Sequence, residues 1–360
     1  MCGFVKECVD KRLTVCLHQL RRASDQYKSD QNATHGIPVL SRGSTLAEPM
    51  DEILYGNAST DEHRQLEVIL EVFLKEKKSH ATYRRVEVGI TNSNWIIKEQ
   101  NNTYFIKLYG ENTHIMIDRS SSVVASKLSG ELGVGPFLYE TFQSPGAEVY
   151  EFLDGYRNSV PEDFANAELR SVLLEKYKKM HNSSPLPLTR TGYDQLEQRY
   201  SLLKEAGIKA PDNHEALMER CRTAAKVINA TKPTLAPCHN DCYSPNFMLN
   251  DAGDVRIVDW EYASNNDPLW DLTMLSLSMQ LPPEEVNWFA EYFDEVPENA
   301  AAKATLYGGM IAVSWGTWAL LQTQYSNIDF DYSEYSKMLL GLGDAMTQGE
   351  AWEAALCQLS

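Results

Sequence analysis

CHNDCYSPNFML at residues 238–249 and VRIVDWEY at residues 255–262 are the two most informative segments of this 360-residue chain. The first contains the pattern His-x-Asp-x-x-x-x-Asn, and the second is an apolar run that ends in an acidic residue. Transfer of a phosphoryl group from ATP to a hydroxyl needs residues of these types in this order. The pattern predicts that Asp241 faces the attacking hydroxyl, that Asn246 binds a metal ion, and that Asp259 binds a metal bridging the phosphates.

Charge explains why such a site needs oxygen ligands. The transition state spreads negative charge over the γ-phosphoryl oxygens, and Mg²⁺ held by carboxylate and amide oxygens neutralises it. Asn246, Asp259 and Glu261 are the candidate ligands, with ATP and Mg²⁺ as the expected cofactors. A zinc cluster is the alternative, but neighbouring residues of an extended segment point in alternating directions, which disfavours it. Its four ligands would be Cys238, His239, Asp241 and Cys242.

The specificity of the signal comes from the combination of motifs. A lone His-x-Asp-x-x-x-x-Asn recurs by chance, and a surface loop beside an unrelated strand would explain it equally well. The apolar strand, its two carboxylates and the segment NDPLWD at residues 266–271 together favour the phosphoryl-transfer interpretation. The sequence contains neither G-x-x-x-x-G-K-[ST] nor G-x-G-x-x-G, so P-loop and dinucleotide-binding folds have no motif to support them.

Composition excludes several other classes of function. The net charge of −17 and the pI near 4.9 would repel a nucleic acid. The apolar stretch 308–321 is shorter than the roughly 20 residues of a membrane span, and we expect a buried helix and no membrane insertion. Seven cysteines without a C-x-x-C pair favour a reducing compartment, and the cytoplasm is expected.

The order of predicted elements indicates an α+β, bilobal, protein-kinase-like fold. A helix is predicted over 61–78, then three strands, a helix over 118–132 and two more strands, giving a five-stranded antiparallel sheet. Beyond residue 155 the chain is mostly helical, apart from a β-rich stretch over 235–258. We expect a flexible extension over 1–60, a small nucleotide-binding β-lobe over 61–155, and a larger helical lobe over 156–360 with the catalytic loop and substrate pocket. The predicted strands are 82–89, 94–98, 103–109, 137–142 and 148–153.

These segments resemble the choline/ethanolamine kinase family, within the superfamily of aminoglycoside phosphotransferases and kinase-like proteins. The resemblance covers about residues 86–340. It implies that the turn GITN at 89–92 covers the phosphates and that Lys107, in YFIKLYG, contacts them. It also implies that the connector 148–153 binds adenine through its backbone. The residues assigned to the nucleotide in this way are Gly89, Thr91, Asn92, Lys107, Glu151 and Leu153.

The resemblance extends to the catalytic residues. It makes Asp241 the base or hydroxyl-orienting group and Asn246 and Asp259 the Mg²⁺ ligands. Glu261 becomes a ligand of a second metal or a carboxylate on the substrate side. His239 also belongs to the catalytic loop, where it holds the loop rather than performing chemistry.

A group of aromatic residues follows in the second half of the chain. Trp315 and Trp318 are three residues apart and share one face of a helix, and Phe330 and Tyr335 follow. Core packing alone would explain such residues. The resemblance instead implies a wall around the ammonium group of choline or ethanolamine, where each desolvated ring is worth roughly 0.5–2 kcal/mol. Tyr262 would close this pocket near the hydroxyl.

Two positions depart from the family pattern. The glutamate expected on the small-lobe helix, as partner of Lys107, is Ser122, and a second glutamate expected near the amine is Ser278. Two rival functions therefore stay open: a kinase of another cationic small molecule, such as an aminoglycoside, and a catalytically silent binding protein. A homodimer is compatible with the sequence, which does not determine the oligomeric state.

Overall fold

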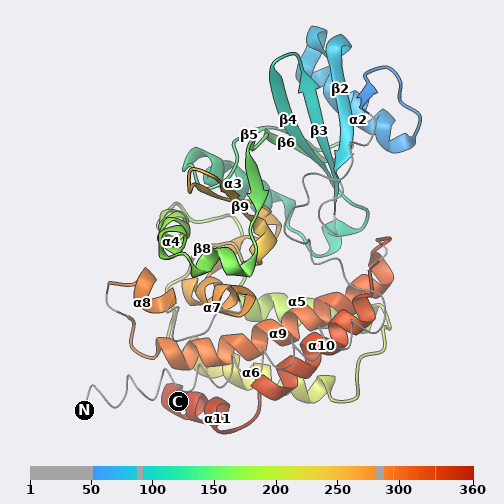
Figure 1. Ribbon diagram of the computed structural model, residues 1–360. Coiled ribbons are helices and arrows are strands. Elements are labelled where there is room, and N and C mark those ends of the chain that lie inside the picture. Colours follow the sequence, from blue (N-terminus) through green and yellow to red (C-terminus); the bar gives the residue numbers. More distant parts are fainter. Residues whose placement is uncertain (1–51, 87–91, 280–287, 295, 329) are drawn as a thin grey trace.

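A computed structural model describes residues 52–86, 92–279, 288–294, 296–328 and 330–360. A small lobe built on an antiparallel sheet stands above a larger helical lobe, with α3 and the β8–β9 segment between the two (Figure 1). The two-lobed α+β fold predicted from the sequence is confirmed. Most of the expected extension 1–60, together with Gly89 and Thr91, lies outside the described residues.

The described elements occur in the following order. The helices are α2 (Asp61–Leu74), α3 (Arg119–Glu131), α4 (Ala167–His181), α5 (Gly192–Glu205), α6 (His214–Ala230), α7 (Pro268–Met279), α8 (Trp288–Tyr292), α9 (Ala300–Tyr325), α10 (Tyr332–Met346) and α11 (Glu350–Leu359). The strands are β1 (Ile53–Leu54), β2 (Ala81–Val86), β3 (Ser93–Glu99), β4 (Asn102–Leu108), β5 (Leu138–Phe142), β6 (Ala147–Glu151), β7 (Tyr156–Asn158), β8 (Ala236–Cys238), β9 (Phe247–Asn250), β10 (Val255–Ile257) and β11 (Ser264–Asn266). Short 3₁₀ turns are η1 (Lys75–His80), η2 (Thr113–Ile115), η3 (Pro161–Ala165), η4 (Ser244–Asn246) and η5 (Trp260–Tyr262).

The sheet of the small lobe has the strand order β1-β2-β3-β4-β6-β5, with all neighbours antiparallel. It contains one strand more than the five expected, because Ile53–Leu54 pairs with β2. Helix α2 begins at the side-chain cap of Thr60, which accepts a hydrogen bond from the backbone N–H of His63 at 3.1 Å. Its apolar face packs on the sheet, so that Leu66, Ile69 and Leu70 share a core with residues of β2 and β3.

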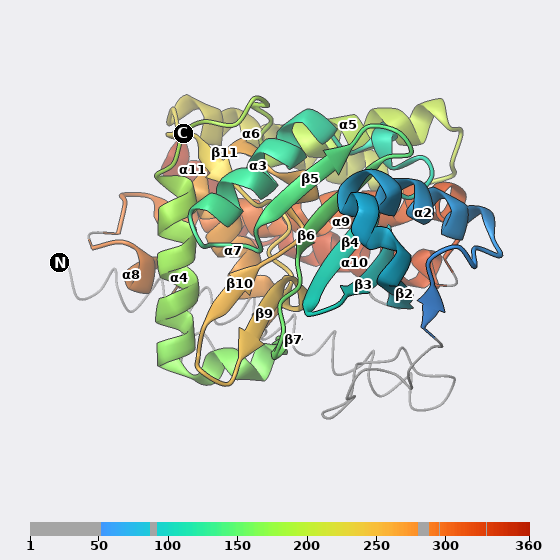
Figure 2. The same cartoon turned by 90° about the horizontal axis from the view of Figure 1, so that it is seen from above.

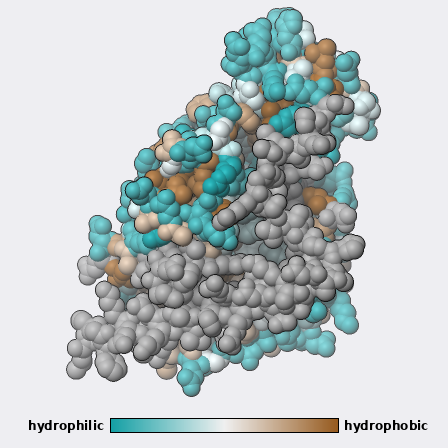
Figure 3. Space-filling model, in the orientation of Figure 1, coloured by the Kyte–Doolittle hydropathy of each residue, from teal (hydrophilic) through white to brown (hydrophobic). Residues whose placement is uncertain are grey.

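The large lobe is organised around α9, which is buried over most of its length. Figure 2 shows α9 and α10 passing beneath the sheet lobe, with α2 at its side. The two helices approach closely at Gly316, because glycine has no Cβ. A Cβ at this position would lie 2.7 Å from Leu340 Cγ of α10. None of the described helices is both long and apolar enough to cross a membrane. Hydrophilic residues cover most of the coloured surface of the upper lobe (Figure 3).

The hairpin β9–β10 places the candidate site between the lobes. Its strands pair antiparallel, with Phe247 opposite Ile257. At the end of the pairing, the backbone N–H of Val258 donates to the carbonyl oxygen of Asn246 at 2.9 Å. Antiparallel pairing therefore brings Asn246 and Asp259, thirteen positions apart in the chain, to the same end of one hairpin.

Candidate active site

The catalytic loop after β8 is held in place by the buried carboxylate of Asp271. Asp271, in the first turn of α7, accepts hydrogen bonds from the backbone N–H groups of His239 and Asn240, each at 2.8 Å. Its side chain is completely buried. Burial alone would raise the pKa of Asp271, but hydrogen bonds from His181 and the loop keep it below its usual value. The carboxylate thus fixes the path of the backbone that leads into Asp241.

His239 connects the loop to the strand end. Its Nε2 donates to the carbonyl oxygen of Val258 at 2.9 Å, while its Nδ1 accepts from the backbone N–H of Asp241 at 3.2 Å. Those two bonds require the neutral ring with its proton on Nε2. Burial lowers the pKa of His239, which favours the same neutral form. The geometry suits the holding role expected for this residue, since neither nitrogen is left for a substrate.

Asp241 and Asn246 face each other across the loop. The Asn246 Nδ2 group donates to the backbone oxygen of Asp241 at 3.0 Å and to its Oδ2 at 3.2 Å. The amide oxygen of Asn246 therefore points away from Asp241. Burial, followed by the nearby charge of Asp259, raises the pKa of Asp241 to about 7. A carboxylate with this pKa is suited to accept a proton near neutral pH.

Asp259 stands at the end of β10 in a left-handed conformation, with φ 69° and ψ 59°. This backbone is uncommon for a residue other than glycine, and such strain is often found at functional sites. Its Oδ1 lies 2.7 Å from Lys107 Nζ of β4. Burial would lower the pKa of Lys107, but the carboxylates of Asp259 and Glu261 outweigh it and raise the pKa overall. Lys107, which we predicted to contact the phosphates, therefore lies beside the candidate metal ligand Asp259.

Glu261 is held by three neighbouring side chains. Its Oε1 accepts from Arg119 Nη1 at 2.7 Å and from Asn92 Nδ2 at 2.9 Å, and Lys107 Nζ lies 3.7 Å away. Arg119 also stacks on Tyr109, 3.7 Å from its ring centroid. Sequence reasoning missed Arg119, although a basic residue at the first position of α3, where a cation is unfavourable, was a usable signal.

A second missed residue is Glu148 on β6. It is buried, at 2% exposure, and lies directly opposite Lys107 in the strand register. Tyr109 donates a 2.7 Å hydrogen bond to its Oε1, and Tyr150 donates to its Oε2. Ser122, at the position where the family pattern expects a glutamate, donates to the carbonyl oxygen of Arg119 at 3.4 Å instead. A carboxylate near Lys107 therefore comes from a neighbouring strand rather than from α3.

The remaining described residues assigned to the nucleotide are Glu151 and Leu153 of the connector and Asn92 beside Glu261. The backbone N–H of Glu151 donates to the carbonyl oxygen of Phe137 at 2.8 Å, which fixes the start of the connector. The carbonyl oxygen of Leu153 accepts from the N–H of Tyr156 at 3.3 Å. Asn92 Oδ1 accepts from the N–H of Gly110 at 3.2 Å, so its side chain bridges the strands next to Glu261.

The five predicted pocket aromatics gather in one cluster beside the loop. Trp318 Nε1 donates to the hydroxyl of Tyr262 at 2.8 Å, and Trp315 lies 5.3 Å from the Tyr262 ring and 5.4 Å from the Trp318 ring, between centroids. Phe330 and Tyr335 form a second edge-to-face pair at 5.6 Å. Sequence reasoning missed Arg199 of α5, whose guanidinium lies 4.5 Å from the Trp315 centroid.

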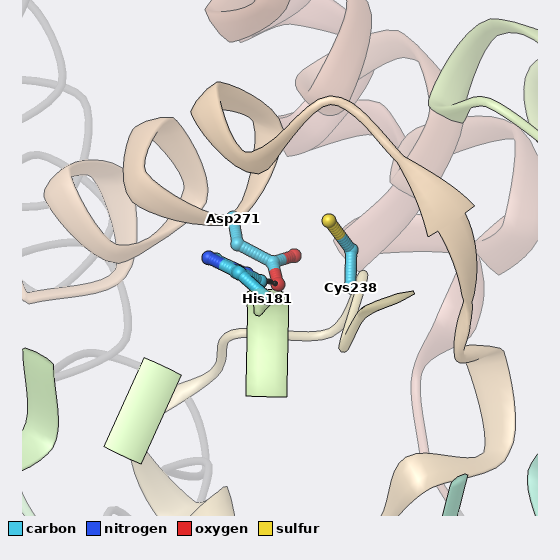
Figure 4. Close-up of side chains that lie close together, drawn as sticks. All are labelled: His181, Cys238 and Asp271. Carbon is cyan, nitrogen blue, oxygen red and sulfur yellow. Dashed lines mark hydrogen bonds and ion pairs between the residues drawn. The ribbon is translucent and has the colours of Figure 1, made fainter. Parts of the chain in front are cut away.

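One group of buried side chains resembles a metal site but is a hydrogen-bonded anchor. In the described part of the chain, donor atoms of His181, Cys238 and Asp271 lie within 4.8 Å of one another (Figure 4). Both oxygens of Asp271 already accept backbone N–H groups, and Cys238 Sγ donates to the carbonyl oxygen of Asn266 at 3.3 Å. Burial raises the pKa of Cys238 well above its usual value, which keeps it a thiol. The zinc alternative drawn from the sequence finds no such convergence among its four residues in the same described part of the chain.

Comparison with known proteins gives one consistent answer. Residues 83–279 match the family model described as "Choline/ethanolamine kinase". Ethanolamine kinase 2 of Rattus norvegicus is 25% identical over 322 residues, which cover 81% of this chain and 80% of that protein. A choline/ethanolamine kinase family protein from Mesorhizobium loti has the same fold at a TM-score of 0.68, with 21% identity and coverage of 83% of this chain and 98% of that one. LicA in complex with AMP gives a TM-score of 0.64, with 20% identity and coverage of 79% and 99%.

Proposed function

Because the chain belongs to the choline/ethanolamine kinase family, we propose that it transfers the γ-phosphoryl group of ATP to the hydroxyl of a small amino alcohol, ethanolamine or choline. One observation carries this proposal. Asp241 and Asn246 from the loop, Asp259 from the strand end and Lys107 from the opposite lobe meet in one cluster. In-line transfer needs a base, oxygen ligands for a cation and a positive group for the phosphates, and this cluster contains all three.

The residues around the cluster are suited to bind a nucleotide. Lys107 is positively charged and lies between two carboxylates, so its ammonium group can contact phosphate oxygens without leaving an isolated buried charge. Arg119 on Glu261 adds a second positive charge to the same surface. Adenine would lie against the connector, where Glu151 and Leu153 present their backbone groups. Gly89, Thr91 and Asn92 would cover the phosphates from the small lobe.

The donor set fits Mg²⁺. Carboxylate and amide oxygens are the ligands that Mg²⁺ prefers, and the amide oxygen of Asn246 and the carboxylate of Asp259 lie at the same end of the hairpin. Asp259 already attracts a cation, since the Lys107 ammonium lies 2.7 Å away. Glu261 would complete the acidic surroundings. When bound, Mg²⁺ neutralises charge that develops on the phosphoryl oxygens.

The chain's own residues then divide the reaction between them. Asp241 orients the acceptor hydroxyl and takes its proton as the oxygen attacks the γ-phosphorus. The bond from that phosphorus to the β,γ-bridging oxygen breaks, and ADP leaves with the electron pair. His239 and Asp271 keep the loop in place, and Lys107 holds the phosphates. The aromatic cluster closes the acceptor side and excludes water.

A coupled assay of ADP formation tests the proposal. We expect ATP consumption to depend on ethanolamine or choline, and an aminoglycoside to give no signal above the rate without acceptor. A polyhydroxylated polycation needs an open acidic groove, whereas rings line the wall of this pocket. Phosphorylation of the aminoglycoside alone, or Mg-ATP binding without any acceptor turnover, would contradict the proposal.

A further inference from the structure

The aromatic cluster proposed to hold the acceptor already contains a positive charge from the chain itself. The guanidinium carbon of Arg199 lies 4.5 Å from the ring centroid of Trp315 and 5.3 Å from that of Tyr262. Trp315 is one of the rings expected to surround the ammonium group of a substrate, and Tyr262 is expected to close the pocket near the hydroxyl. A cation is stabilised on the face of a tryptophan or tyrosine ring in this distance range, whichever molecule supplies it. Arg199 therefore competes with a substrate ammonium group for the same ring faces.

Arg199 is buried and makes no ion pair with the described residues, although the charge of Asp241 acts on it from farther away. It is 3% exposed, and its Nη1 donates to Ser314 Oγ at 2.7 Å. Its Nη2 is buried and has no hydrogen-bond partner, and none of the described carboxylates lies within ion-pair distance of the side chain. Burial lowers the pKa of Arg199 to about 10, so the group remains charged at neutral pH. A buried charge of this kind is unfavourable for folding, and it is retained where a site needs it.

The acidic residue that would balance the pocket is also absent. The family pattern places a glutamate near the amine, and this chain has Ser278 there, whose hydroxyl donates to the carbonyl oxygen of Leu275 in its own helix at 3.4 Å. Arg190 carries a second positive charge near Arg199 and Tyr262, and its Nε is likewise buried without a partner. Arg199 and Arg190 thus both contribute positive charge near Tyr262.

We propose that Arg199 is a specificity-determining residue that makes this kinase prefer ethanolamine to choline; the inference rests on the proposed function. Choline has no N–H group, and its trimethylammonium group depends on ring faces that Arg199 occupies. Ethanolamine carries its ammonium group two carbons from the hydroxyl. Both groups can donate to the oxygens of one carboxylate, here Asp241, without using those ring faces. The primary amine thus has an anionic partner that a quaternary amine cannot use in the same way.

The first measurement uses the unmodified protein. We expect kcat/KM for ethanolamine to exceed that for choline by about tenfold or more, mainly through a higher KM for choline. Equal values, or a preference for choline, would overturn the inference while leaving the proposed function intact. If neither acceptor supports ADP formation, the proposed function fails as well, and the two results are therefore distinguishable.

Two variants then test whether the charge of Arg199 causes the preference for ethanolamine. Arg199→Met removes the charge but keeps an unbranched side chain against the rings, and we expect the ethanolamine-to-choline ratio to fall about tenfold. Arg199→Lys keeps the charge and should keep the preference, so it separates charge from shape if the methionine variant folds poorly. The matched control is Arg222→Met on α6, another arginine over a tyrosine ring, 5.4 Å from the centroid of Tyr200. An unchanged ratio in a folded Arg199→Met protein, or a ratio shifted equally by the control, would overturn the role of Arg199.

Discussion

The phosphoryl-transfer end and the acceptor end of the candidate site differ in whether their positive side chains form ion pairs. At the phosphoryl-transfer end, Lys107 and Arg119 are paired with Asp259 and Glu261, and each positive group has a carboxylate within 2.7 Å. At the acceptor end, Arg199 lies on aromatic rings with no ion pair among the described residues. Paired charges can exchange partners when phosphates and a metal ion arrive, at little electrostatic cost. The charge of Arg199, which forms no such pair, can instead repel or exclude the ammonium group of a substrate bound next to it. We therefore infer that nucleotide binding and chemistry belong to the first end and substrate selection to the second.

The sharpest way to test the division is to remove the residue that joins the two ends. Asp241→Asn keeps the shape of the side chain but removes the proton acceptor, and we expect kcat to fall about 10²- to 10⁴-fold. The KM for ATP should change little, because we propose that the nucleotide is held by Lys107 and the small lobe. Steady-state kinetics with ethanolamine measures both values.

The control for that variant is Asp251→Asn, an exposed residue in the turn between β9 and β10. It should match the unmodified protein in every kinetic constant. Near-normal turnover by the Asp241→Asn protein would remove Asp241 from the chemistry. A large rise in the KM for ATP would instead mean that the two ends are not separable in the way we infer.

A smaller effect is expected where the phosphoryl-transfer end differs from its family pattern. Glu148→Gln keeps the hydrogen bonds to Tyr109 and Tyr150 feasible but removes a negative charge facing Lys107. We expect kcat/KM for ATP to fall by up to about tenfold, which corresponds to about 1.4 kcal/mol of lost electrostatic support for Lys107. Glu148→Asp should restore part of the loss.

The same variant also tests whether Glu148 affects only the phosphoryl-transfer end. If Glu148 acts through Lys107, the ethanolamine-to-choline ratio should stay constant while the ATP parameters move. Glu140→Gln, on the exposed side of β5, is the control. A Glu148→Gln protein that loses thermal stability but keeps its ATP kinetics would show that this carboxylate is a structural residue of the sheet.

The sequence predicts the two ends unequally, for a physical reason. Asp241, Asn246 and Asp259 are recognisable because a loop and a hairpin need only local pairing to bring them together. The two-lobed fold follows from the order of elements in the same way. Arg199 and Glu148 could not be predicted, because α5 meets α9, and β6 meets β4, only after the chain folds. Each looks like an ordinary surface residue in its own segment, and only its neighbours in space give it a role.

The smallest effect is expected for Asp254, a paired carboxylate that lies away from the candidate active site. Asp254, at the end of the turn between β9 and β10, accepts from Tyr156 at 2.7 Å and Arg256 at 2.8 Å, and Lys176 lies 3.1 Å away. Partial burial would raise the pKa of Asp254, but these three groups lower it to about 2. The folded protein therefore holds the proton more weakly than the unfolded chain, and the stabilisation is present above the unfolded pKa near 4 and is lost as the pH falls toward 2.

Asp254→Asn should accordingly lower the free energy of unfolding by about 1–2 kcal/mol at pH 7. Denaturant unfolding at several pH values should show the difference from the unmodified protein narrowing below pH 4. The kinetic constants should not change, because no ligand group reaches this pairing. A variant with altered kinetics but unchanged stability would mean that ion pairs outside the cleft also tune the reaction. Ion pairing would then influence the reaction throughout the protein, rather than only at the two ends of the candidate site.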